Sequence, residues 1–504
     1  MDEQAIRDSL TERLVRYCQI DSGSIKGIKN PDGSDMVPST DRQRTFVGAL
    51  EEEAQSNGFH TEIKDWGLYV RLNANVEGAT PMTLSAHADT TQDAPNEGVE
   101  VMLTTWQGND IHLPSGEVIS ANASEELESC RYGDTIFTSN GNTLLGGDDK
   151  AGIAIGMETL LKIKESGMAH GDVELAITYD EETGLLGAQK IIKDDIRGEF
   201  VLVYDSSKGE MGTGTFNAAG AYPIIKAELL EEGKNAYGAT IRINGKNTFP
   251  GFGKKDKMVD PFRTLPAVME ILGAEGIPVT DVKCDSLDAL ELRVAVEDAK
   301  QLSKLGEIED ARLSKGNAVN YLVDDNLSPV VVRYDLSQVL ALVNATPYEM
   351  AAETTEERVG YIQPYSISKA DNGDDLKVDV LLRDHDADLL TDKKRLVEGA
   401  IPGIEIKDQY QNKEAALAKH PEFLELIDEA FAHAGVEEPL SRTTIRGGDE
   451  SFVYTVALGK PSVNLPAFLD SSIHTVRERA SLDVMHQGVK AAIYVANHFA
   501  QGKD

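Results

Sequence analysis

Residues 173–184 read VELAITYDEETG, a nearly unbroken apolar run followed at once by an acidic triplet. A short run of this kind is typical of a strand that is buried on both faces of its sheet. Similar runs occur at 82–86 (MTLSA) and 200–204 (FVLVY), and helix-like segments precede them at about 2–18 and 40–57. The sequence therefore predicts an α/β fold with helices on both faces of the sheet.

A Gly-Gly turn leads into a helix-like segment at 148–164. The last ~95 residues repeat this pattern, because helices are expected again at about 421–435 and 480–500, with a short strand in PSVNLP between them. The two ends of the chain therefore resemble each other in style.

The middle of the chain has a different character, with strand-like ATIRING and DLKVDVLLRD and helix-like PFRTLPAVMEILG. We therefore expect a larger α/β domain built from residues 1–217 and 408–504. A smaller α+β domain, residues 218–407, is inserted into it, and an extra acidic segment at about 275–350 lies inside this insertion.

The charge of the chain limits its partners. The 504 residues include 49 Lys and Arg against 85 Asp and Glu, a formal charge of −36. Nucleic acid and anionic membranes are polyanions, so neither is expected as a partner. A solvated acidic surface explains most of the excess, and excess carboxylate also suits a protein that binds cations.

The cysteines indicate the compartment. Cys18, Cys130 and Cys284 are far apart, odd in number and without CxxC spacing, which fits a reducing compartment, and we expect a cytoplasmic protein. The N-terminal segment is an amphipathic helical pattern without the features of a signal peptide. No later segment approaches the roughly 18 uninterrupted apolar residues that a membrane helix needs.

Metal-capable side chains follow the predicted strands, at the sheet edge where α/β proteins collect ligands. Including the Gly-Gly turn and the late segment SSIHTVRE, they are His87, Asp89, Asp148, Asp149, Glu181, Glu182, Asp205 and His474. Each alone has an ordinary explanation, such as a structural histidine, an N-capping aspartate or a solvated acidic loop. Together they would concentrate negative charge in one cleft, which divalent cations would relieve.

Such a cleft predicts a specific chemistry. Two zinc-like ions about 3.5–4 Å apart that share one carboxylate can polarise a carbonyl and generate hydroxide at neutral pH. A glutamate that is not a ligand can accept the water's proton and pass it to a leaving amine. One of Glu181 and Glu182 would hold a metal while the other is the general base, and spacing does not assign the two roles.

The segments SAHADTT, LLGGDDKAG, TYDEETG, VYDSS, TTIRGGDES and IHTVRE resemble the motif set of the co-catalytic di-zinc metallopeptidase family, which includes carboxypeptidase G and succinyl-diaminopimelate desuccinylase. MVPST, WQGNDIHL, VLLRDHD and HPEFLELIDEA resemble its tripeptide aminopeptidase (peptidase T) branch. The resemblance covers most of the chain except about 275–350. It implies a di-zinc catalytic domain with an inserted, dimerisation-type lid, and removal of the N-terminal residue from short peptides.

Residue by residue, the resemblance implies two Zn²⁺ sites, which Co²⁺ or Mn²⁺ could also fill, sharing the bridging carboxylate of Asp148. The side chains that complete them are His87 and Asp205 for one site and Glu182 and His474 for the other. Glu181 would be the general base, and Asp89 would accept the second N–H of His87. The Asp148–Asp149 peptide bond is cis in the family.

On the substrate side, Arg446 in IRGG and Arg383 in LLRDHD resemble the family's anion-binding arginines, whose forks suit the free carboxylate of a peptide. For Arg383, a surface ion pair with Asp384 or Asp386 is an alternative interpretation of equal weight. Asn412 in QYQNKE resembles a substrate-side asparagine of the family, and a simple loop role is equally open.

The sequence departs from the family in the inserted domain. Members carry a histidine there, in an HPG context, that steadies the oxyanion, whereas this chain reads NGKNTFPGFGKKDK with Phe249 at the matching place. Phenylalanine cannot donate that hydrogen bond, and loss of one oxyanion donor typically costs about a hundredfold or more in rate. Nearby candidates for a substitute donor are Lys254, Lys255, Lys257 and His385.

Other functions stay open on the same residues. One is an amidohydrolase or carboxypeptidase of the same fold that acts on N-acyl amino acids, and another is a metal-dependent peptide-binding protein without turnover. A purely structural acidic protein would bind no zinc. The family's dimerisation-type domain also suggests a homodimer.

Overall fold

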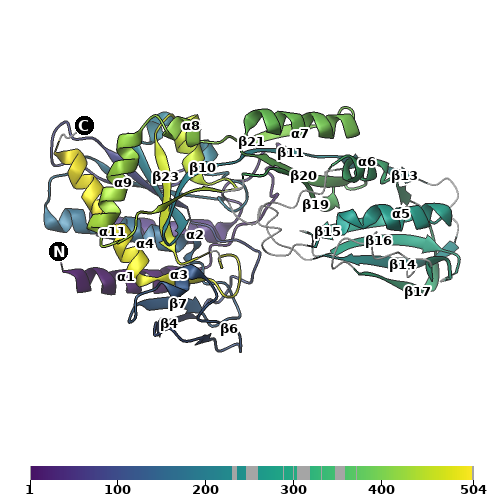
Figure 1. Ribbon diagram of the computed structural model, residues 1–504, viewed down its shortest axis with the longest axis horizontal. Helices are drawn as coiled ribbons and strands as arrows, with labels where there is room; N and C mark the ends of the chain where they lie inside the picture. The colour runs from purple at the N-terminus through teal and green to yellow at the C-terminus, as the bar shows by residue number, and fades with distance from the viewer. Residues whose placement is uncertain are drawn as a thin grey trace. The chain divides into compact units, whose positions relative to one another are not determined.

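The computed structural model divides the chain into two compact units. Unit 1 contains residues 1–215, 413–444 and 448–504, and unit 2 contains 216–412 and 445–447. The residues that the structure describes are 2–229, 235–245, 259–285, 287, 289–298, 300–303, 318–330, 332–346, 358–370, 372–445, 447–470 and 472–501. In Figure 1, unit 1 carries the colours of both chain ends, whereas unit 2 carries those of the middle.

The main sheet of unit 1 has the described strands in the order β1-β2-β8-β3-β9-β23-β10-β22. Their bounds are β1 His60–Lys64, β2 Gly67–Leu72, β3 Met82–His87, β8 Val173–Thr178, β9 Phe200–Ser207, β10 Glu210–Thr215, β22 Ser441–Ile445 and β23 Ser462–Phe468. The central strands β8, β3, β9 and β23 are parallel. Every residue of β3 and β8 is buried, as the apolar runs predicted.

Both faces of this sheet are apolar because alternate strand residues face opposite ways, and long helices cover one face while short helical turns cover the other. Leu175 and Ile177 of β8 belong to the core under the long helices, whereas Ala176 belongs to a second core on the other face. The long helices are α1 Glu3–Cys18, α2 Asp41–Ser56, α4 Gly147–Ser166, α9 Pro421–His433 and α11 Leu482–Ala500. Purple α1 and yellow α11 pack together, so both chain ends build one core (Figure 1).

The remaining elements of unit 1 are short. The other face of the sheet carries α10 Glu450–Phe452 and a π-helical turn, Val453–Ala457. A small sheet of β4 Val101–Thr105, β7 Thr135–Ser139 and β24 Arg479–Ser481 has its own apolar cluster around Trp106. The others are β5 Ile111–His112, β6 Val118–Ile119, α3 Glu125–Glu128, α8 Glu414–Leu417 and the 3-10 turns Ala188–Lys190 and Lys193–Asp195.

Unit 2 is an antiparallel sheet with helices, the expected α+β type. Its described strands run β17-β14-β16-β15-β19-β20-β11-β21, with β12 beside β20. Their bounds are β11 Asn217–Ala221, β12 Ile224–Ile225, β14 Asn235–Asn244, β15 Val279–Asp285, β16 Ala289–Val296, β17 Val319–Pro329, β19 Tyr361–Lys369, β20 Leu376–Asp384 and β21 Ile406–Tyr410. Strands β13 Ala227–Leu229 and β18 Val332–Tyr334 form a separate pair.

The helices of unit 2 lie in a row, α5 against α6 and α6 against α7, and α7 packs on β20 and β11 (Figure 1). Their bounds are α5 Leu265–Ala274, which follows the 3-10 turn Pro261–Arg263, α6 Ser337–Ala345 and α7 Ala387–Ala400. Together with the sheet they enclose one apolar core.

The described strands β15, β16 and β17 within 275–350 are part of the sheet of this unit. Of these, β15 and β16 lie in the interior of the sheet order, and Val282, Leu290 and Leu292 enter the core. The exposed alternate positions carry charges, which gave the segment its mixed appearance in the sequence.

Two further findings concern membrane helices and the cysteines. Within the described ranges, no helix combines the length and the apolarity that a bilayer-spanning segment requires. The three cysteines are free and buried.

Candidate metal centre

Ligand-type side chains meet at one edge of the unit 1 sheet. Strands β3, β8 and β9 are parallel, so their carboxyl ends lie at the same edge. His87 ends β3, and Asp205 lies near the end of β9. The non-helical start of α4 supplies Asp148, and the loop after β23 supplies His474.

The Gly-Gly turn and the non-helical start of α4 place two carboxylates, Asp148 and Asp149, in the centre. Gly146 has the left-handed φ of 77° that the turn requires. The peptide bond between Asp148 and Asp149 is cis, as the family resemblance implied. Regular helix geometry begins only after Asp149, and the carboxylate of Asp149 accepts the N–H of Gly152 at 3.0 Å.

The glutamate pair leaves β8 through a strained residue. Asp180 has a φ of 55°, in the left-handed region, and it turns the chain away from the sheet. Its buried carboxylate accepts the N–H of Ser39 at 2.7 Å, the Ser39 hydroxyl at 2.5 Å and the Gln43 amide at 2.7 Å. These bonds fix the point from which Glu181 and Glu182 project.

Asp89 contacts both the histidine and the glutamate pair. Its two oxygens accept the backbone N–H groups of Glu181, at 2.9 Å, and Glu182, at 3.2 Å. Its Oδ1 also lies 3.6 Å from His87 Nδ1, on the side of the ring that faces away from Asp148. The sequence anticipated only the imidazole contact.

The donor atoms form two groups, within each of which all atoms lie within 4.8 Å of one another. The groups are His87, Asp149 and Asp205, and Asp148, Glu182 and His474. Asp148 also joins the two groups, because its Oδ1 lies 3.0 Å from His87 Nε2 and its Oδ2 lies 3.3 Å from His474 Nε2. Asp149 is one of the metal-capable residues that the sequence offered, but the family resemblance placed it in neither ligand set.

His474 is held by acidic groups on both ring nitrogens. Its Nε2 lies 3.0 Å from Glu182 Oε1, and its Nδ1 lies 3.4 Å from Asp93 Oδ2. Sequence reasoning missed Asp93, although a carboxylate on the second nitrogen is usual for a metal-binding histidine. Among the described residues, Glu181 belongs to neither donor group, in contrast to its neighbour Glu182.

The charge of the centre is unbalanced without cations. Burial, together with the Asp148 carboxylate, raises the pKa of Asp205 to about 8. Burial raises the pKa of Glu181 well above its ordinary value; His87 opposes this rise, and the carboxylates of Asp205 and Glu182 add to it. Carboxylates outnumber imidazoles here, and mixed nitrogen and oxygen donors in threes suit zinc. The residues therefore fit a pair of divalent cations.

The predicted substrate residues belong to unit 2 where they are described. Arg383 is buried, donates to the carbonyls of Ala219 at 3.0 Å and Leu382 at 2.9 Å, and lies over the Tyr410 ring. The alternative of a surface ion pair is wrong, because the Asp384 carboxylate pairs with Lys393 instead.

Asn412 has contacts of a structural kind. Its backbone N–H donates to Asn217 Oδ1 at 3.0 Å, and its side-chain amide donates to the His385 carbonyl at 3.4 Å. The His385 ring lies edge-on to Phe216. The residues that fall outside the described ranges are Arg446, Phe249, Lys254, Lys255 and Lys257.

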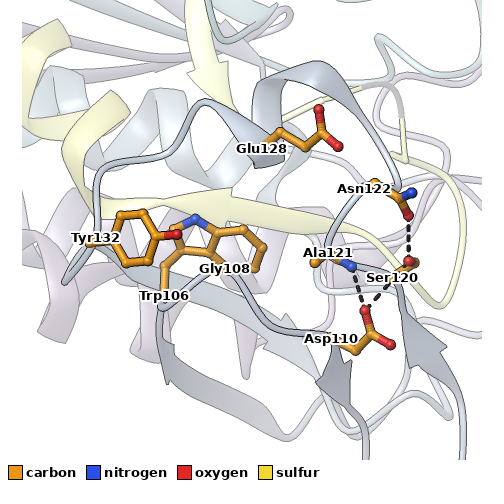
Figure 2. Close-up of a pocket in the computed structure, with 8 residues that line it drawn as sticks. All are labelled: Trp106, Gly108, Asp110, Ser120, Ala121, Asn122, Glu128 and Tyr132. Atoms are coloured by element: carbon orange, nitrogen blue, oxygen red, sulfur yellow. Dashed lines mark hydrogen bonds between the residues drawn. The ribbon is translucent and has the colours of Figure 1, made fainter.

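A separate hollow of about 480 Å³ lies in the small β4–β7 region (Figure 2). Its polar groups bond to one another: Asp110 accepts from the Ala121 N–H at 2.7 Å, and Ser120 donates to Asn122 at 2.6 Å. Its lining residues are Trp106, Gly108, Asp110, Ser120, Ala121, Asn122, Glu128 and Tyr132. This hollow shares no residue with the two donor groups.

With this geometry, the chain belongs to the peptidase family M20/M25/M40, whose profile matches residues 139–498. This is a family of metal-dependent peptidases, and the predicted family and α/β fold are confirmed. Its relatives include peptidase T proteins, the branch that the motifs resembled. The protein from Staphylococcus carnosus (strain TM300) is 26% identical over 521 residues, which cover 99% of this chain and 100% of that protein.

A second sequence match is more local. Peptidase T of Macrococcus caseolyticus (strain JCSC5402) is 31% identical over 277 residues, 54% of this chain, and the match spans only 62% of that protein. Among solved structures, the aminopeptidase PepT from Bacillus cereus ATCC 10987 superposes with a TM-score of 0.56 at 16% identity, covering 98% of this chain and 99% of that one. At this identity, the likeness shows a shared fold.

Proposed function

We propose that this protein is a di-zinc aminopeptidase that removes the N-terminal residue from short peptides, tripeptides in particular. The observation that carries the proposal is the Asp148 carboxylate, whose two oxygens face the imidazoles of His87 and His474. A carboxylate shared between two donor groups is the arrangement that two-metal hydrolysis needs. The peptidase T relatives supply the peptide class of the substrate.

This function gives a role to each ligand-type residue of the centre. His87, Asp205 and Asp148 would hold one metal, with Asp149 as a further donor, and Asp148, Glu182 and His474 would hold the other. Bound there, the ions would polarise the scissile carbonyl and lower the pKa of the attacking water. Glu181 accepts the proton of that water and delivers it to the amine as the peptide bond breaks.

The fixed backbone around Glu181 supports this role. Asp89 holds the N–H groups of both glutamates, so Glu182 is oriented toward His474 while Glu181 stays outside the donor groups. A base kept off the metal retains the free oxygen that must take the proton. On the substrate side we propose that Arg383, Arg446 and Asn412 contribute to peptide binding, with the arginines pairing with its carboxylate.

Metal removal tests the proposal. Release of the N-terminal residue from an unblocked tripeptide should vanish after chelation and return when zinc is added, while the N-acetylated tripeptide should stay uncleaved in every sample. Cleavage of the blocked peptide alone would instead identify an N-acyl amino acid hydrolase. Two bound zinc ions without any turnover would identify a peptide-binding relative.

A second test concerns His474. The substitution His474→Ala removes the only imidazole of the second donor group, so the purified protein is expected to hold about one metal ion instead of about two. Inductively coupled plasma mass spectrometry measures this content. His170→Ala is the control, since His170 is buried in the same unit and bonds to the Gly171 carbonyl at 2.7 Å. Full metal content in His474→Ala would contradict the assignment.

We further propose a cytoplasmic location and a homodimer. The location is supported by the free, buried cysteines. The dimer is supported by the resemblance of the inserted unit to the dimerisation-type domain of the family. Sedimentation equilibrium of the zinc-loaded protein would distinguish a dimer from a monomer.

A further inference from the structure

Glu478 faces the turn that carries the bridging carboxylate. It is 1% exposed and lies four residues after His474 in the loop that follows β23. Its Oε2 accepts the backbone N–H groups of Leu145 and Gly146, each at 3.1 Å, and its Oε1 accepts the N–H of Asp148 at 2.9 Å. One buried side chain thus accepts three backbone N–H groups from the four residues 145–148, where the turn enters α4.

These three N–H groups have no helical partners of their own. They precede or open α4, where backbone donors are left over by the i to i−4 pattern. The left-handed Gly146 bends the chain so that its N–H groups converge, the kind of concave backbone that binds an anion. Burial raises the pKa of Glu478 to about 7, and the hydrogen bonds from the backbone N–H groups of Asp148 and Gly146 oppose that rise.

The same loop also supplies a donor to the centre. His474 contacts Asp148 through Nε2, and Glu478 binds the backbone N–H of that same aspartate. We therefore infer that Glu478 is a positioning residue, which sets the Asp148 carboxylate against the His474 imidazole. The inference rests on the proposed two-metal function, and it names a group outside the two donor sets.

Glutamine at this position tests the inference with little change of shape. An amide has one acceptor oxygen, and its NH₂ group would face an N–H donor of the turn. Glu478→Gln is therefore expected to weaken zinc binding at the Asp148, Glu182 and His474 site by about 10–100-fold, the usual range when a partner of a metal ligand is lost. In the same variant, zinc affinity at the other site should change less from its wild-type value.

The measurement is zinc competition against a chromophoric chelator, followed by the visible absorption of Co²⁺ in the same sites. Glu174→Gln is the matched control. Glu174 is also fully buried and accepts the N–H groups of Arg197 at 2.9 Å and Gly198 at 3.1 Å, but at the amino end of β8, opposite the centre. The variant Glu174→Gln should lower stability without changing zinc affinity or the cobalt spectrum.

Wild-type affinity at both sites in Glu478→Gln would overturn the inference, even if the protein melted at a lower temperature. If that variant does not fold, Glu478→Asp keeps the carboxylate but withdraws it by one methylene. Weaker binding at one site then supports the inference, and unchanged binding at both overturns it. A wild-type protein that binds two metals but cleaves no tripeptide would remove the proposed function and leave this comparison intact.

Discussion

Replacing Glu181 with glutamine is expected to lower kcat on a tripeptide by about 10²–10⁴-fold, the usual contribution of a general base, while the protein keeps both metal ions. Glutamine has nearly the shape of glutamate but cannot take a proton from water. The backbone should not move, because Asp89 binds the N–H groups of residues 181 and 182 rather than their side chains. Steady-state kinetics and metal analysis of one preparation measure both effects.

Glu182→Gln is the control because it alters the adjacent residue of the same pair. Its Oε1 lies 3.0 Å from His474 Nε2 within a donor group, so this variant should lose metal together with activity. The two glutamines therefore separate a proton-transfer role from a ligand role. Near-normal turnover by Glu181→Gln, with Glu182→Gln retaining its metal, would reverse the two assignments.

The sequence could predict the strand ends because apolar runs and the polar residues that follow them are local features. His87 at the end of β3 and the glutamate pair after β8 needed only the length of each run and the rule that parallel strands end at one edge. Glu478 was beyond such reasoning. It binds the N–H of Asp148 across 330 positions of sequence, and spacing carries no information about that contact.

Local reasoning failed in a different way for Arg383. Adjacent charges in LLRDHD suggested an ion pair, but neighbouring residues of a strand point to opposite faces. Asp384 therefore meets Lys393 of α7 at 2.8 Å, Asp386 caps that helix, and the guanidinium of Arg383 turns to backbone carbonyls. The sequence predicted this strand. The partners of Arg383 and Asp384 depend on the face of the sheet to which each side chain points.

A buried lysine of unit 1 carries the second large effect. Lys413 is completely buried, and its Nζ donates to the Gly212 carbonyl at 2.9 Å and lies 3.5 Å from both oxygens of Asp449. Asp449 in turn accepts from Asn464, whose amide exchanges hydrogen bonds with the backbone of Asp205 at 3.0 and 2.9 Å. The pair thus supports the strand that presents a proposed metal ligand.

Lys413→Met is expected to lower the free energy of unfolding of unit 1 by about 3–5 kcal/mol, because it leaves the buried Asp449 carboxylate without its cation. The double variant Lys413→Met with Asp449→Asn should lose much less, since both charges leave together. Both tryptophans, Trp66 and Trp106, lie in unit 1, so urea unfolding followed by tryptophan fluorescence reports this unit. Chelator in every sample keeps metal binding from adding to the stability.

Arg442→Met is the control, because it shows how much stability is lost when a partly exposed ion pair of the same unit is broken. Arg442 pairs with Asp428 at 3.0 Å in the same unit, but both side chains are partly exposed, and such pairs contribute about 0–1 kcal/mol. Lys413→Met costing no more than Arg442→Met would mean that Asp449 tolerates burial without the lysine. A double variant as unstable as the single one would instead trace the loss to the volume and hydrogen bonds of Lys413 rather than to its charge.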